Sequence, residues 1–235
     1  MHSLSKSGIL YIVATPIGNL EDITLRALKV LKEVNLIAAE DTRHTKKLLN
    51  FYNIKTRIIS YREQNREKQG KKILKLLKEG KNVALVSDAG TPCISDPGVH
   101  LVDLALKEGI KVVSIPGPSA LVAALSIAGV PIHPFLFLGF LPQKEGKKRK
   151  LFESLKNIHY TIVFFESPHR LKKTLKLLEE IYPESNIVIA REVTKLHEEI
   201  IRGKIKEIQE KLKEIKGEIT IILTRTASIS GRKIN

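Results

Sequence analysis

Acidic residues and an arginine directly follow a short apolar run in the first third of the chain. Glu40, Asp41 and Arg43 come after Leu36–Ala39, and Asp88 follows another apolar run further along. A partly buried carboxylate has a raised pKa and can take a proton from a substrate hydroxyl. An arginine beside it can hold a phosphate or pair with a carboxylate. These four polar residues are therefore the catalytic candidates, and the three carboxylates are alternative bases.

Segments rich in polar residues, glycine or proline each follow an apolar run. These segments are Thr15–Leu20, Glu40–Thr45, Tyr61–Asn65, Asp88–Gly98 and Pro116–Ala120. The turns that precede the apolar runs, such as Lys78–Lys81, contain only residues that are common in ordinary turns. Ligands of open parallel sheets bind outside the carboxyl ends of the strands, so one edge is predicted to carry the site. Taken singly, each segment could be an ordinary turn whose aspartates only accept backbone hydrogen bonds.

Short apolar runs alternate with amphipathic segments up to residue 115. The predicted strands are Ile9–Ala14, Leu36–Ala39, Arg57–Ser60, Asn82–Ser87 and Lys111–Ile115. The predicted helices are Ile23–Glu33, Thr45–Tyr52, Arg66–Glu79 and Gly98–Lys107. Because strands and helices alternate, the pattern predicts a parallel sheet covered by helices on both faces.

The second half of the chain has a different pattern. Its predicted strands are Phe135–Phe140, Thr161–Phe165, Asn186–Ala190, Glu198–Gly203 and Glu218–Thr224. Its predicted helices are Ala120–Ala128, one in the basic stretch near Lys144–Lys150, Leu171–Ile181 and Lys206–Lys216. Consecutive strands without a helix between them predict a mixed sheet. The stiff Pro116-Gly117-Pro118 run predicts two α/β domains, over residues 1–116 and 117–235, with a ligand cleft between them.

Composition and missing motifs narrow the class of protein. Of 235 residues, 43% are hydrophobic and Cys93 is the single cysteine, which favours a reducing, cytoplasmic compartment. The most membrane-like stretch, Ser119–Pro142, is broken by prolines and is better explained as a buried helix followed by a strand. G-x-G-x-x-G, Walker A, H-E-x-x-H and G-x-S-x-G motifs are missing from the sequence, and the histidines do not cluster. We therefore expect neither a membrane span nor a metal site.

Basic residues outnumber acidic residues by 40 to 25, which gives a net charge of +15. Such an excess attracts polyanions and predicts a nucleic-acid partner. A lysine-rich, heat-adapted composition is the alternative, but it would raise the glutamate content as well. Tyr61 could stack on a base or be buried in the core. The candidate RNA-binding residues are Arg43, Lys46, Lys47, Arg62, Arg66, Lys147, Lys148, Arg149 and Arg170.

The same segments resemble those of one protein family. The runs concerned are Thr15–Asp22, Ala39–Arg43, Ser87–Gly98, Pro116–Ala120, Phe165–Arg170 and Arg191–Lys195. They are very similar to the ribosomal RNA small subunit methyltransferase I family of the tetrapyrrole methylase superfamily, from about Gly8 to Thr224. Two departures stand out: Tyr61–Asn65 lacks the histidine-rich run of many members, and the extra C-terminal helical segment of many members is missing. We therefore expect a weaker catalytic role for Tyr61–Asn65 and a smaller RNA surface.

The resemblance implies a two-domain class III methyltransferase fold. It also implies a homodimer with S-adenosylmethionine in the interdomain cleft, the N-terminal domain on the RNA side and the C-terminal domain on the cofactor side. The implied reaction is 2′-O-methylation of a cytidine in the decoding region of 16S rRNA, so 16S rRNA or the small ribosomal subunit is the expected partner.

The resemblance also assigns residues to the cofactor. These are Asp88, Ala89, Gly90, Pro92, Ile94, Ser95, Pro118, Ser119, Ala120, Gly139, Phe140, Leu141, Glu166, Ser167, Ala190, Arg191 and Glu192. Gly90 would let the backbone approach a ligand closely. Ser119 suits a helix N-cap, with free N–H groups that bind polar ligand atoms, or is a plain cap.

Two other functions fit the pattern less well. One is a methyltransferase of the same superfamily that acts on a tetrapyrrole or a protein, which the Glu40–Arg43 and Glu166–Arg170 runs disfavour. The other is a non-catalytic RNA-binding assembly factor, which the intact Asp88–Gly98 segment disfavours.

Overall fold

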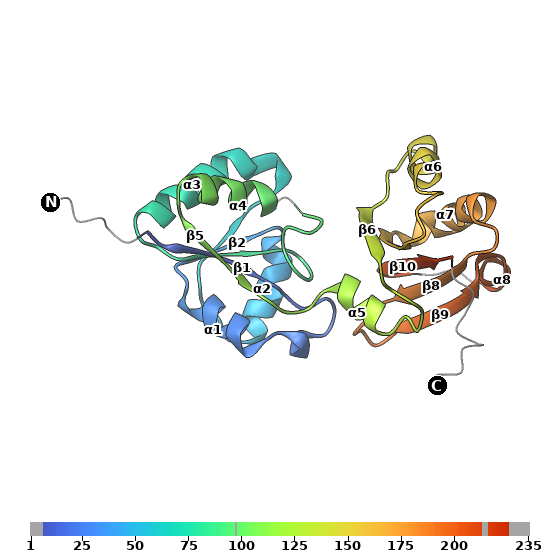
Figure 1. Cartoon of the computed structure of the whole chain (residues 1–235). Helices are drawn as coiled ribbons and strands as arrows, with labels where there is room; N and C mark the ends of the chain where they lie inside the picture. The colour runs from blue at the N-terminus through green and yellow to red at the C-terminus, as the bar shows by residue number, and fades with distance from the viewer. Residues whose placement is uncertain (1–6, 97, 213–215, 226–235) are drawn as a thin grey trace, which may run out of the picture. The chain divides into compact units, whose positions relative to one another are not determined.

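The computed structural model (Figure 1) describes residues 7–96, 98–212 and 216–225. The chain divides into two compact units, with the break between Ser119 and Ala120. Each unit has its own five-stranded sheet and its own hydrophobic core. Both are α/β units, which agrees with the predicted α/β class.

The first unit is a parallel sheet with helices on both faces. Its elements are β1 (Ile9–Val13), the 3-10 helix η1 (Leu20–Asp22), α1 (Leu25–Glu33), β2 (Leu36–Ala39), α2 (Thr42–Phe51), β3 (Ile58–Ser60), the 3-10 helix η2 (Glu63–Asn65), α3 (Arg66–Lys78), β4 (Val83–Val86), α4 (Gly98–Lys107) and β5 (Lys111–Ile115). The strand order is β3-β2-β4-β1-β5, and every pairing is parallel. The predicted parallel sheet is confirmed.

Two hydrophobic layers hold this sheet between its helices. On one face, Ala27 and Leu31 of α1 and Leu48 of α2 pack in one buried cluster with alternate strand residues. On the other face, Ile73 of α3 and Leu101 of α4 are fully buried in a second cluster. Figure 1 shows α1 and α2 on one side of the sheet and α3 and α4 on the other. Strands buried on both faces explain the near-continuous apolar runs.

The strand register brings several loops to one edge. Ala39 of β2 pairs with Ser60 of β3 and with Val86 of β4. The residues that follow these strands, Glu40, Tyr61 and Ser87, therefore begin at the same level of the sheet. This is the carboxyl edge at which the sequence predicts the site.

The second unit has a mixed sheet, as predicted. Its elements are α5 (Ala120–Ser126), β6 (Phe135–Phe140), α6 (Glu145–Ser154), β7 (Thr161–Glu166), α7 (Pro168–Ile181), β8 (Asn186–Arg191), β9 (Glu199–Lys204), α8 (Ile205–Lys211) and β10 (Ile219–Thr224). The order is β6-β7-β10-β8-β9, in which β6 and β7 are parallel and the other pairs antiparallel. Helices α6, α7 and α8 pack in one core cluster and α5 in another.

Two helices begin three residues before their predicted starts. The first turn of α2 starts at Thr42 because the Asp41 carboxylate accepts a hydrogen bond from the Arg43 N–H at 2.8 Å. The first turn of α7 starts at Pro168, since proline is well suited to the first helical position. The stretch 119–142 forms the short helix α5 and the strand β6. Among the described residues, no helix is long and apolar enough to cross a membrane.

Candidate functional site

Glu40 follows β2 and has the properties of a proton acceptor. Its side chain is half-buried at the carboxyl edge of the first sheet. Burial raises the pKa of Glu40, and the negative charge of Asp88 raises it further. A partly buried carboxylate with a raised pKa at this edge is suited to accept a proton.

Asp41 has a different role. Its carboxylate caps α2 and forms an ion pair with Arg43, at 2.9 Å between Arg43 Nη2 and Asp41 Oδ2. Hydrogen bonds from Arg43 hold the pKa of Asp41 well below its usual range. The alternative in which Arg43 pairs with a carboxylate is therefore the one that the structure contains. Asp41 stays ionised and is a poor proton acceptor.

Asp88 and Arg62 join neighbouring loops to this pair of acids. One Asp88 carboxylate oxygen accepts a hydrogen bond from the Asp41 N–H at 2.8 Å. Arg62 Nε donates to the Glu40 carbonyl oxygen at 2.7 Å, and Arg62 Nη2 lies 3.6 Å from Asp41 Oδ1. The ends of β2, β3 and β4 are therefore connected by polar contacts, which fixes the backbone around Glu40.

The loops after β1, β4 and β5 are also connected. Thr15 and Gly90 exchange two backbone hydrogen bonds, of 2.9 and 3.0 Å. Gly90 has a φ of +78°, and a side chain there would contact Ile17 and Pro118. The Thr91 hydroxyl donates to the Pro118 carbonyl oxygen at 3.2 Å. These contacts place the predicted cofactor segments 88–90 and 118–119 side by side within the first unit.

Asp96 has a structural role. This agrees with the alternative in which an aspartate of this segment accepts backbone hydrogen bonds within a turn. Its carboxylate accepts hydrogen bonds from the Cys93 N–H at 2.8 Å and the Gly98 N–H at 2.9 Å. Cys93 has a φ of +70°, and burial raises the pKa of its thiol to about 11. Between them, Ile94 and Ser95 are exposed. The folded turn therefore presents Ile94 and Ser95 outward, while the buried Pro92 side chain is not available to a ligand.

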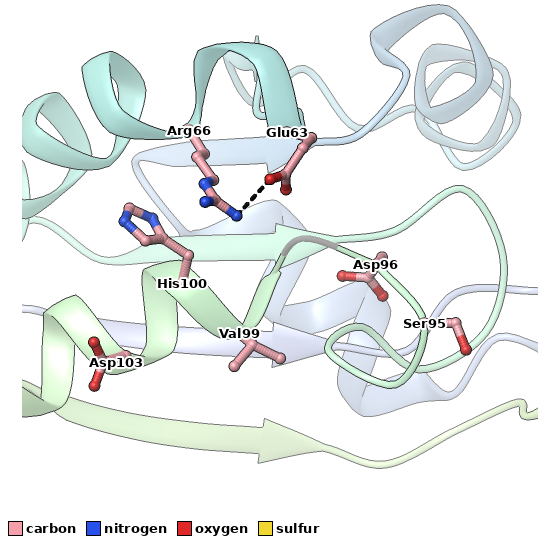
Figure 2. A pocket seen from close by; sticks show the side chains of 7 residues that line it. All are labelled: Glu63, Arg66, Ser95, Asp96, Val99, His100 and Asp103. Atoms are coloured by element: carbon pink, nitrogen blue, oxygen red, sulfur yellow. Dashed lines mark ion pairs between the residues drawn. The ribbon is translucent and has the colours of Figure 1, made fainter. Parts of the chain in front are cut away.

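A pocket of about 580 Å³ opens beside this turn. Its lining side chains come from the start of η2 and α3 on one side and from the loop and start of α4 on the other (Figure 2). They are Glu63, Arg66, Ser95, Asp96, Val99, His100 and Asp103. The pocket brings together Arg66, predicted to bind RNA, and Ser95, predicted to bind the cofactor. Sequence reasoning missed the site residues Val99, His100 and Asp103, because helix residues of this kind give no signal of a cavity.

Tyr61 and His100 form a hydrogen-bonded chain behind the pocket. The Tyr61 hydroxyl lies 3.0 Å from His100 Nδ1, and His100 Nε2 lies 3.1 Å from a carboxylate oxygen of Glu67. Tyr61 is buried, and burial raises its pKa to about 12. Of the two roles expected for Tyr61, a core position is therefore confirmed, and stacking on a base is not compatible with its burial.

The second unit contains a buried ion-pair network around Glu166. The Glu166 carboxylate is fully buried and contacts Lys148 Nζ at 3.1 Å, Thr174 Oγ1 at 2.6 Å and Arg170 Nε at 2.7 Å. The Ser167 N–H donates to it at 2.8 Å. Burial by itself would raise the pKa of Glu166, but these hydrogen bonds and the Lys148 charge lower it overall.

This network corrects two expectations. Lys148 cannot contact RNA, because its ammonium group is buried between Glu166 and Thr174. The Glu166 side chain cannot contact a cofactor, because its oxygens are enclosed by other side chains. Arg170 is also engaged there, whereas Lys147 is exposed. Sequence alone does not reveal this, since a basic run and a motif glutamate give the same signal whether exposed or buried.

Other predicted site residues of the second unit lie at the carboxyl ends of β6 and β8, and Arg149 lies in α6. Gly139 has a φ of +61°, and next to it Phe140 is 63% exposed. Leu141 and Ala190 are buried, so they can offer a ligand only backbone atoms. Arg149 pairs with Glu180, Arg191 pairs with Glu199, and Glu192 pairs with Lys195. In the described part of the chain, acidic, histidine and cysteine side chains form no group that could hold a metal ion.

Comparison with known proteins agrees with the resemblance seen in the sequence. Residues 9–209 match the model of the family described as Tetrapyrrole (Corrin/Porphyrin) Methylases. The chain is 54% identical to Ribosomal RNA small subunit methyltransferase I of Thermotoga maritima, over 92% of this chain and 98% of the relative. It is 50% identical to the protein of the same name from Bacillus subtilis, over 93% of this chain and 76% of the relative. The chain belongs to the ribosomal RNA small subunit methyltransferase I family.

Solved structures with lower identity share the fold of this methyltransferase I family member. A diphthine synthase superposes with a TM-score of 0.74 at 14% identity, over 93% of this chain and 91% of that chain. The cobalt precorrin-4 methyltransferase CbiF superposes with a TM-score of 0.70 at 20% identity, over 92% of this chain and 94% of that chain. These similarities establish the fold alone.

Proposed function

We propose that the protein transfers a methyl group from S-adenosylmethionine to the ribose 2′-hydroxyl of a cytidine in the decoding region of 16S rRNA. The observation that carries this proposal is the half-buried Glu40 at the carboxyl edge of the first sheet, in a loop held by hydrogen bonds that involve Arg62 and Asp88. The relatives at 50–54% identity are named as small-subunit rRNA methyltransferases, which supports RNA as the substrate. A cytoplasmic homodimer belongs to the same proposal.

The residues of the first unit suit a ligand that approaches the backbone closely. Ala89 is exposed and has a small side chain, Gly90 has a positive φ, and Ile94 is 55% exposed as an apolar surface. Pro118 and Ser119 lie beside Gly90 and Thr91 and are half-buried. S-adenosylmethionine supplies a methyl group activated by its sulfonium. These residues of the first unit would hold it.

Glu40 acts as the proton acceptor in this proposal. A ribose hydroxyl is a weak acid, so a carboxylate with a raised pKa assists its attack by taking the proton. Arg62, bound to the Glu40 carbonyl oxygen, and Asp88, bound to the Asp41 N–H, hold that backbone in position. The reaction also depends on alignment of the hydroxyl with the methyl group, which can contribute roughly 7–11 kcal/mol in favourable cases.

Exposed cations on α2 would bind the RNA backbone. Arg43, Lys46 and Lys47 are all exposed on this helix, which begins directly after Glu40 and Asp41. Contacts of this type to phosphate position the RNA and carry no sequence information. Arg62, Arg66 and Lys147 extend the proposed RNA-binding set.

The alternatives have weaker support. A tetrapyrrole or protein substrate is suggested by solved structures at 14–20% identity, compared with 54% for an rRNA methyltransferase. A non-catalytic assembly factor would not need a proton acceptor, yet Glu40 retains a raised pKa.

The test is a methylation assay with small ribosomal subunits that lack the modification. The protein is incubated with S-adenosylmethionine labelled in its methyl group, and the modified nucleotide is then mapped. We expect one labelled cytidine that carries the methyl group on its 2′-oxygen. Subunits already methylated at this site serve as the control and should take up no label. Label on a base, or no label at all, would contradict the proposal.

A further inference from the structure

Hydrogen-bond acceptors dominate the pocket between η2, α3 and α4. Glu63 and Asp103 contribute carboxylates, Ser95 a hydroxyl and His100 an imidazole, while Arg66 contributes a guanidinium. The Asp96 carboxylate also lines the pocket and accepts two backbone hydrogen bonds. Asp103 is paired with Lys107 at 2.7 Å, and Arg66 with Glu63 at 2.5 Å (Figure 2). A phosphate would be repelled by these carboxylates. An uncharged group with N–H donors would suit them. The pocket is rich in carboxylates, although the net charge of the whole chain is +15.

The pocket has the other features of a site for a planar base. Val99 is 58% exposed and offers an apolar contact on the wall formed by α4. Arg66 has further N–H groups besides the one paired with Glu63, since a guanidinium carries five. A guanidinium can donate to the ring acceptors of a base or stack on its face. A volume of about 580 Å³ leaves room for a nucleoside.

The pocket lies near the backbone of the candidate proton acceptor. Arg62 donates to the Glu40 carbonyl oxygen at 2.7 Å, and the next residue, Glu63, lines the pocket. On the opposite wall, His100 Nδ1 lies 3.0 Å from the hydroxyl of Tyr61, whose backbone N–H donates to the carbonyl oxygen of Ala39, the residue before Glu40, at 2.8 Å. A base in the pocket would therefore place its own ribose beside Glu40.

We infer that this pocket binds the base of the nucleotide that is methylated and selects an amino-bearing base of the cytosine type over uracil. Cytosine presents an N4 amino group, which carboxylates accept, and its O2 and N3 atoms can accept from Arg66. Uracil presents a carbonyl oxygen in place of the amino group, which faces the same carboxylates unfavourably. This inference rests on the proposed function and adds the pocket that would recognise the base of the target nucleotide.

The test combines a binding measurement with an activity measurement. Cytidine and uridine, which lack phosphate, are titrated into the protein while the Val99 methyl signals are followed by NMR. We expect cytidine to shift these signals at concentrations at which uridine does not. In the activity arm, subunits with cytidine or uridine at the target position are compared, and we expect a preference for cytidine of roughly 10- to 100-fold.

Two variants make the test specific. Val99→Trp fills the pocket from an exposed position, and we expect it to lower methylation at least about 10-fold. Leu106→Trp is the matched control, because Leu106 is equally exposed on α4 and does not line the pocket. Glu63→Gln removes one carboxylate and should reduce the preference for cytidine over uridine.

The outcomes separate this inference from the proposed function. If wild-type protein methylates no subunit but cytidine still shifts the Val99 signals, the pocket stands and the proposed reaction fails. If methylation proceeds equally with cytidine and uridine and Val99→Trp has no effect, the pocket assignment fails and the reaction stands. If Val99→Trp slows methylation of assembled subunits but not of protein-free RNA, the pocket binds a protein segment and the inference is overturned.

Discussion

Lys147 and Lys148 are neighbours in the sequence, yet α6 places them in opposite environments. Both belong to a basic run that predicts RNA contact, but Lys148 is buried against Glu166 while Lys147 is exposed. The sequence does not show which lysine is buried, because the rotation of α6 is set by its packing against the rest of the unit. Glu40 is one of three carboxylates that the sequence offers as alternative bases, because each follows an apolar run. The raised pKa that distinguishes Glu40 comes from burial and from the nearby Asp88 charge, which the sequence does not show.

Replacing Lys148 with methionine should destabilise the protein by about 3–5 kcal/mol, because it leaves the Glu166 charge buried with fewer partners. Lys147→Met is the matched control and should change stability by less than about 0.5 kcal/mol. Denaturant unfolding measures both. Because the folded pKa of Glu166 is lowered, the pair stabilises the protein above the unfolded pKa of glutamate and loses this effect as pH falls through the folded pKa. Equal losses in the two variants would argue against the buried pair.

Replacing Glu40 with glutamine should lower kcat by about 10²–10⁴-fold, because the hydroxyl proton loses its acceptor. In the wild-type protein, kcat should fall as pH decreases through the pKa of Glu40, since only the ionised carboxylate accepts a proton. That pKa is raised, so the fall should occur above the ordinary pH range of a glutamate. Rate measurements against pH test this, and Glu40→Gln should lack the same fall. A full rate in the variant would exclude Glu40 as the base.

The sequence predicts the bounds of the strands better than the first residues of α2 and α7. Leu36–Ala39 and Lys111–Ile115 form strands with the predicted bounds, because continuous apolar runs are a strong local pattern. The starts of α2 and α7 depend on a capping carboxylate and a first-turn proline, which a search for apolar periodicity does not weigh. The pocket could not be predicted, since it needs the relative positions of α3 and α4.

Two glycines in helices should respond to alanine in opposite directions. A Cβ on Gly98 would lie 2.7 Å from the Cys93 sulfur and 2.9 Å from Leu85 Cδ2, so Gly98→Ala should destabilise by about 1–3 kcal/mol. A Cβ on Gly146 in α6 would have no atom within 4 Å, so Gly146→Ala should stabilise by about 0.5–1 kcal/mol. Thermal unfolding of both variants measures the difference. A stabilised Gly98→Ala would contradict the tight packing between this loop and α4.

The overall charge of the protein is strongly positive, but ion pairs within the fold engage part of it. The net charge is +15, yet several predicted RNA-binding residues are engaged with acidic partners, including Arg43, Arg66 and Arg149. Composition predicts the class of partner, because long-range attraction depends on total charge. It cannot predict which residues touch RNA, since ion pairing within the fold decides which cations are free.

RNA affinity should fall steeply with salt, because binding releases the counterions of the phosphates that the protein contacts. The double variant Lys46→Ala/Lys47→Ala should weaken binding and reduce the slope of log K against log salt concentration by about 1–2. Lys29→Ala/Lys32→Ala is the matched control on the exposed side of α1, with the same loss of charge. Binding titrations at several salt concentrations provide the slopes. Equal slopes for the two double variants would show that α2 has no special role in RNA binding.

Cys93 is a native thiol whose reaction rate can be used to follow one loop. Its thiol has a pKa of about 11, so roughly one molecule in a thousand carries a thiolate at pH 8, and alkylation requires that form. As the single cysteine of the chain, it needs no engineered label and has no competing thiol. The rate at which an alkylating reagent consumes it should therefore respond to changes in the turn held by Asp96, and a ligand that covers this turn should slow the reaction.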